Sequence, residues 1–138
     1  MPARRFTVMD KSITEAEKAG LLKPIYDYMD IRAKYVEYRY HYGRVYDTKQ
    51  VYPIEQHLRR LESRSLRKLR EIFDIIENLS CDERRIILKT SVFERDCVND
   101  LIAKLDSSIY AWFRFGRTIN GEERFDVFRQ AYTDVLKK

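Results

Sequence analysis

The apolar residues of the chain recur at helical spacing in two long segments. Spacings of three and four residues alternate between Tyr28 and Val45, which is the pattern of a coiled-coil-like helix. After Pro53, a second apolar stripe predicts a helix over residues 54–78. Because the connection is short, we expect the two helices to form a long antiparallel hairpin. The predicted stripe of the second helix consists of Ile54, Leu58, Leu61, Leu66, Leu69, Phe73, Ile76 and Leu79.

Shorter helices are predicted on both sides of this hairpin, where the sequence matches the capping box. Ser12-Ile-Thr-Glu15 predicts a helix from about residue 13 to 22, which would end near Gly20. Ser80-Cys-Asp-Glu83 predicts another helix, from residue 81 to about 90. The residues before the hairpin and directly after it are therefore expected to be helical as well.

The last third of the chain has the layout of a helix-turn-helix. A helix over residues 97–105, a tight turn at Asp106-Ser107-Ser108 and a helix over residues 109–119 are predicted, followed by a closing helix over residues 122–136. The fold class is therefore all-α, with a long antiparallel hairpin and then an array of short helices resembling a helix-turn-helix. We expect one helical domain over residues 1–138, in which residues 1–79 hold the hairpin and residues 80–138 hold the helix-turn-helix-like part.

The composition favours a folded helical protein and indicates its cellular location. With only 4 Gly and 3 Pro, the chain has too few turn residues for a sandwich or barrel. No signal-peptide pattern occurs in residues 1–20, and no run approaches the roughly 18 apolar residues that span a bilayer. Cys81 and Cys97 form no CxxC pair, so we expect reduced thiols, no metal site and a cytoplasmic location without membrane attachment.

No motif for catalysis is found. His41 and His57 are the only histidines, and neither has a nucleophile or an acid beside it in a recognised arrangement. Phosphate-binding glycine loops are also missing from the sequence. We therefore expect no enzymatic activity, no catalytic residues and no cofactor, and a function in binding a macromolecule.

Positive charge is concentrated in the second helix of the predicted hairpin. The chain has a net charge of +5, but residues 90–138 carry 8 basic and 8 acidic groups. The densest basic segment runs from residue 59 to 70, where Arg60, Arg64, Arg67 and Lys68 share a helical face opposite the leucine stripe. Such a face can bind DNA phosphates, although a solvated face that pairs with acids elsewhere has the same pattern.

A tyrosine-rich stripe lies on the first helix of the hairpin, at Tyr28, Tyr35, Tyr38 and Tyr42. One interpretation is a half-buried stripe that packs on the neighbouring helix, with each hydroxyl reaching water. The other is a protein interface or dimer interface, because tyrosine combines a large apolar ring with a polar end.

The predicted helix-turn-helix supplies a second set of candidate DNA contacts. Ser107 and Ser108 would stand at the start of the recognition helix, and Tyr110, Arg114 and Arg117 would face outward from it. Arginine can read guanine with two hydrogen bonds, and serine at a helix start can hold a phosphate. The alternative is an ordinary core helix of a bundle.

From about Leu69 onward, the sequence resembles the ArpU/RinA-type phage transcriptional regulators. The similar segments are Cys81-Asp-Glu-Arg-Arg-Ile-Ile, Ser107-Ser108-Ile-Tyr110-Ala-Trp112 and the stretch from Phe128 to Tyr132. The resemblance implies a helix-turn-helix like that of sigma-factor region 4. The chain departs from the family pattern in its short turn without glycine, and in Phe113 and Phe115, where polar or basic residues are usual.

Two functions follow as expectations. The first is a DNA-binding transcriptional regulator of phage or mobile-element type, a homodimer that binds double-stranded DNA and contacts RNA polymerase or another host protein. The second is a small phage-type interaction protein that modulates a host protein without binding DNA, through the tyrosine stripe and the aromatic helix from Tyr110 to Phe115.

Overall fold

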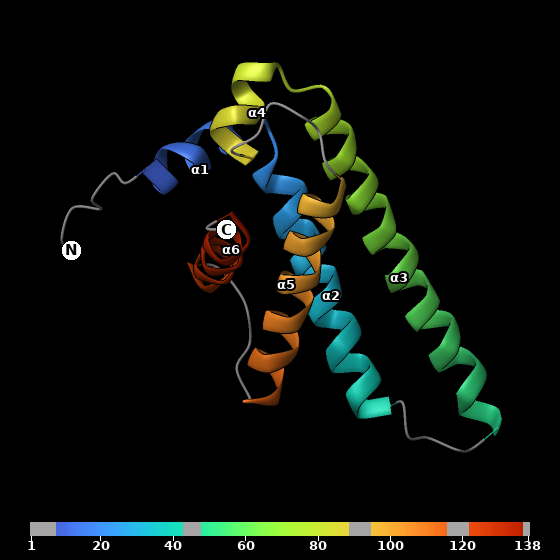
Figure 1. The fold of residues 1–138 in the computed structure, drawn as a ribbon. Helices are drawn as coiled ribbons and strands as arrows, with labels where there is room; N and C mark the ends of the chain where they lie inside the picture. Colours follow the sequence, from blue (N-terminus) through green and yellow to red (C-terminus); the bar gives the residue numbers. More distant parts are fainter. Residues whose placement is uncertain (1–7, 43–47, 89–94, 116–121, 137–138) are drawn as a thin grey trace.

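The computed structural model describes residues 8–42, 48–88, 95–115 and 122–136, and all of its regular elements are helices (Figure 1). Six helices make up this described part of the chain: α1 (Val8–Lys18), α2 (Leu22–Tyr42), α3 (Thr48–Glu77), α4 (Cys81–Leu88), α5 (Arg95–Arg114) and α6 (Glu122–Leu136). The predicted all-α class is therefore confirmed, and the last helix has the predicted bounds.

The predicted long hairpin is confirmed as the scaffold of the molecule. Helix α2 packs antiparallel along α3, and α5 lies against another side of α2 (Figure 1). Helix α6 packs on α5, and α1 packs on α4. Among the described residues, no helix is apolar over a length that could cross a membrane.

One apolar core joins the end of the hairpin to the shorter helices. Met29 of α2, Ile72 of α3, Leu105 of α5 and Phe128 of α6 have no exposed surface, and all belong to one cluster of buried side chains. Burying a side chain of this size stabilises the fold by about 1.5–3 kcal/mol relative to exposing it. The core therefore holds α5 and α6 against the hairpin, although they lie far from it in the sequence.

Two of the helix ends have hydrogen bonds that the sequence motifs predict. Gly20 has a φ of +78°, and Leu21 N–H donates to the carbonyl of Ala16, which is the Schellman ending of a helix. At the start of α4, the Glu83 N–H donates to the Ser80 hydroxyl, and the Ser80 N–H donates to the Glu83 carboxylate. The capping box at residues 80–83 is thus confirmed.

The predicted starts of two helices are wrong. Helix α1 begins at Val8, so Ser12 lies inside the helix with a buried side chain and does not cap it. Helix α3 begins at Thr48, so Pro53 lies inside α3 and does not precede it. Proline near a helix start removes only one backbone hydrogen bond, and the long apolar stripe that follows outweighs this loss.

The predicted apolar stripe of α3 is wrong at one position. Leu66 is 52% exposed, whereas Ile72, outside the predicted stripe, is fully buried. A step of five residues from Leu61 to Leu66 turns the helix by about 500°, which carries Leu66 well away from the buried side. Ser65 takes the buried place instead, and its hydroxyl donates to the carbonyl of Glu62.

The predicted turn at Asp106-Ser107-Ser108 is also wrong. These residues lie within α5, which continues without a break and ends at Arg114. The Asp106 carboxylate accepts a hydrogen bond of 2.8 Å from the Tyr28 hydroxyl of α2. An aspartate favours turns because it can bond to its own backbone, and here a tertiary partner takes that place. Residues 97–114 of the predicted helix-turn-helix therefore form one helix, and residues 116–119 lie outside the described part of the chain.

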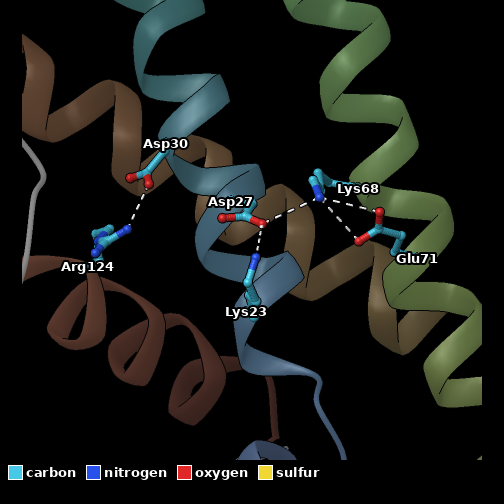
Figure 2. Close-up of polar contacts among 6 residues, drawn as sticks. All are labelled: Lys23, Asp27, Asp30, Lys68, Glu71 and Arg124. Atoms are coloured by element: carbon cyan, nitrogen blue, oxygen red, sulfur yellow. Dashed lines mark hydrogen bonds and ion pairs between the residues drawn. The ribbon is translucent and has the colours of Figure 1, made fainter.

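Ion pairs connect α2 to α3 and to α6 (Figure 2). Lys68 of α3 lies 3.4 Å from the Asp27 carboxylate and 3.3 Å from Glu71. Arg124 of α6 donates a hydrogen bond of 2.7 Å to Asp30. These contacts fix which faces of α3 and α6 remain in solvent.

Candidate nucleic-acid interface

A row of arginines covers the solvent side of α3. We call it the arginine face, and it consists of Arg59, Arg60, Arg64, Arg67 and Arg70. All five side chains are exposed, and none forms an ion pair with another residue in the described ranges. The row extends for about 16 Å along the helix axis. It is long enough to lie along several phosphates of one strand.

Lys68 belongs to the same sequence segment but has a different role. Its hydrogen bonds to Glu71, and then to Asp27, raise the pKa of Lys68 above its ordinary value. The side chain is thus held between α3 and α2, beside the arginine face and not on it. Because Lys68 occupies the Glu71 carboxylate, the neighbouring arginines keep their charges without a local partner.

A groove runs between the C-terminal halves of α2 and α5. We call it the α2–α5 groove, and the residues that line it are Arg32, Tyr35, Val36, Arg39, Tyr40, His41, Asp106, Tyr110, Phe113 and Arg114. This set contains three arginines and one carboxylate, and four of its ten residues are tyrosine or phenylalanine. The groove is therefore both cationic and aromatic.

Polar contacts between the two helices form the floor of the groove. Arg32 lies 3.4 Å from the Asp106 carboxylate, and its guanidinium stacks over the Tyr35 ring at 4.7 Å. Burial, together with the Asp106 carboxylate, raises the pKa of the Tyr28 hydroxyl below this floor. Asp106 is thus already satisfied by Tyr28 and Arg32, and its charge is offset.

The walls of the groove carry the side chains that a ligand would meet. Tyr40 is 66% exposed and Tyr110 is 54% exposed, although Tyr40 also contacts Phe113 edge-to-face at 5.1 Å. Arg39 is exposed and forms no ion pair with other described residues. Arg114 lies 6.0 Å from the Tyr110 ring, in cation–π geometry. Exposed tyrosine rings and guanidinium groups without an ion pair among the described residues therefore lie together in the groove.

The structure divides the predicted DNA contacts of the last third. Tyr110 and Arg114 line the α2–α5 groove, whereas Ser107 and Ser108 lie mid-helix in α5 and do not line it. With no helix beginning at residue 108, the serines cannot hold a phosphate at a helix start. Arg117 lies outside the described residues.

The predicted tyrosine stripe is also divided. Tyr28 is only 3% exposed, so it belongs to the core and not to a protein interface, which corrects the prediction at this position. Tyr38 is half-buried against His57 of α3, with ring centres 4.2 Å apart, and it also contacts Tyr42. Tyr35 turns to the α2–α5 groove. The half-buried stripe is thus the better description of Tyr38, whereas Tyr28 is buried in the core.

Several groove residues were not predicted as site residues from the sequence, among them Arg32, Arg39 and Tyr40. Arg32 and Arg39 stand seven residues apart, which places them on one helical face of α2, and this spacing is visible in the sequence. The sequence did not predict that α5 lies beside that face. Within the described part of the chain, no three His, Cys, Asp or Glu side chains are grouped to hold a metal ion.

Comparison with known proteins adds no assignment. No protein-family model, no curated protein and no solved structure matches this chain.

Proposed function

We propose that this protein binds double-stranded DNA through the arginine face of α3 and has no catalytic role. The observation that carries the proposal is the set of five exposed arginines without a carboxylate partner among the described residues. On most solvated helices such charges alternate with acids, yet Glu62 is the only acid between Arg59 and Arg70. A polyanion supplies the missing negative charge and releases its counterions on binding.

Binding of this kind positions the protein on the DNA backbone and does not by itself read a sequence. The resemblance of residues 69–132 to ArpU/RinA-type regulators favours a role in transcription, as a homodimer that contacts RNA polymerase. Because α5 is continuous, this role does not rest on a helix-turn-helix formed by residues 97–119. A palindromic site in the bound DNA, together with a dimer in light scattering, would support it.

The alternative function, binding of a host protein without DNA, has less support. The two surfaces predicted for it are the tyrosine stripe and the aromatic helix, and one residue of each, Tyr35 and Tyr110, lines the same groove. However, helical partner segments dock into apolar grooves, and Val36 is the only aliphatic residue among the described residues that line this one. The arginine face also has no role in that function.

Fluorescence anisotropy with a labelled duplex tests the proposal. We expect binding at about 50 mM salt that weakens steeply towards about 200 mM, as counterion release requires. The combined variant Arg60→Gln, Arg64→Gln, Arg67→Gln should lose about tenfold or more in affinity, and its salt slope should fall by about 0.9 for each lost phosphate contact.

A matched control separates the arginine face from net charge alone. The variant Lys34→Gln, Arg85→Gln, Arg129→Gln removes the same charge from exposed positions on α2, α4 and α6. It should bind the duplex within about twofold of the unmodified protein, since it leaves the phosphate contacts intact. Absence of duplex binding at low salt, or an equal loss in the control variant, would contradict the proposal.

A further inference from the structure

We propose that the α2–α5 groove is a second binding site, which takes an unpaired nucleic-acid strand. The bases would stack on Tyr40 and Tyr110, and the phosphates would pair with Arg39 and Arg114. The site uses different helices and different side chains from the arginine face. It does not depend on the proposed duplex binding.

Charge complementarity points to an anionic ligand. The Asp106 carboxylate, the one acid among the described residues that line the groove, already accepts from Tyr28 and pairs with Arg32. The charges of Arg39 and Arg114 therefore remain uncompensated within the groove.

The ring content of the groove favours nucleic acid over an acidic peptide. A docked peptide helix needs aliphatic pockets, and within the described ranges the groove offers only Val36. Tyr40 and Tyr110 are more than half exposed and so offer aromatic surface on which a base can stack, and Arg114 lies over one side of the Tyr110 ring. A row of rings with arginines beside them is the usual combination in proteins that bind single strands.

The requirement for stacking selects an unpaired strand. In a duplex, each base is already stacked on its neighbours and paired across the helix, so its ring faces are not available to protein side chains. The rings of the groove can add stacking energy only if the bases are free. Duplex DNA can meet the arginine face through its phosphates but cannot use the groove in this way.

The test uses the full chain and fluorescence anisotropy with labelled oligo(dT) and oligo(U) of about 15 nucleotides, within the usual site sizes. Tyr110→Ala should weaken binding of the better oligonucleotide by about tenfold, whereas Tyr110→Phe keeps the ring and should stay within about twofold. The better binder of the two identifies the strand as DNA or RNA. Duplex affinity should not change in either variant, and circular dichroism verifies the fold.

Three further variants locate the strand. Tyr52 of α3 is 65% exposed, as large a ring as Tyr110 and similarly accessible, so Tyr52→Ala is the matched control and should bind as the unmodified protein does. Arg39→Gln combined with Arg114→Gln should lower the affinity and the salt slope, whereas Arg85→Gln combined with Arg129→Gln should change neither.

Several results would overturn the proposal. They are unchanged binding in Tyr110→Ala, an equal loss in Tyr52→Ala, and full affinity in Tyr110→Leu, which keeps apolar area without a ring. Competition by polyglutamate as effective as that by the oligonucleotide would indicate an acidic protein segment instead. None of these bears on the arginine face, because duplex binding is measured separately in the same variants.

Discussion

The Tyr28 hydroxyl of α2 donates a hydrogen bond of 2.8 Å to the Asp106 carboxylate of α5, across 78 positions of sequence. This contact joins the hairpin to the last third of the chain at the floor of the α2–α5 groove. It also explains why an aspartate occurs in the middle of a helix. This hydrogen bond thus gives Asp106 a partner within a continuous helix, and it connects the two helices that form the walls of the groove.

We expect Tyr28→Phe to lower the free energy of unfolding by about 1.5 kcal/mol at neutral pH, the contribution of a hydrogen bond to a charged group. Burial raises the pKa of Tyr28 in the folded state, so the folded protein holds this proton where the unfolded chain releases it. The stabilisation is complete below about pH 10 and declines above it. Urea denaturation should show the difference between the two proteins narrowing as the pH rises past that value.

Lys68 and Arg64 should contribute unequally to duplex binding although both lie in the basic segment. Arg64→Gln should weaken the duplex affinity several-fold and reduce the salt slope by about one. Lys68→Gln should leave both within about twofold, because Lys68 is held by Asp27 and Glu71. Anisotropy titrations at several salt concentrations distinguish them. Equal effects would mean that Lys68 leaves its ion pairs when DNA binds.

Ser107 tests the continuity of α5. Because this side chain is exposed within the helix, Ser107→Ala should stabilise the protein and Ser107→Gly should destabilise it, with a difference of about 1 kcal/mol between them. Thermal or urea denaturation followed by circular dichroism gives the measurement. A glycine variant as stable as the alanine variant would indicate a turn at this position.

The buried side of α3 can be verified by a pair of alanine variants. Ile72→Ala removes a fully buried side chain and should cost about 3 kcal/mol in the free energy of unfolding. Leu66→Ala changes an exposed residue and should cost less than about 0.5 kcal/mol. Chemical denaturation measures both. A larger loss for Leu66→Ala would restore the stripe that the sequence predicts.

Local signals were sufficient for much of the fold. The alternating spacing after Tyr28, the leucine-rich stripe of residues 54–79, the capping box at Ser80 and the end of α1 at Gly20 all depend on neighbours within a few residues. Such features follow from the helical period and from backbone geometry. They therefore predicted the all-α class, the hairpin and the closing helix, and they identified the basic segment of α3.

Tertiary packing decided the rest. Asp106-Ser107-Ser108 has the composition of a turn, but its backbone is helical. The Asp106 side chain bonds to Tyr28 of α2 and not to its own backbone, and the core packs against α5 along its length. Lys68 differs from its arginine neighbours because its amino group lies within reach of both Asp27 of α2 and Glu71 of its own helix. Likewise, Arg39 and Arg114 line the same groove because α5 packs against α2. The sequence by itself determined that the chain is helical, that a long hairpin forms and where positive charge is dense, since these depend on nearby residues. Only the three-dimensional contacts determined which charges stay unpaired and which rings share a surface.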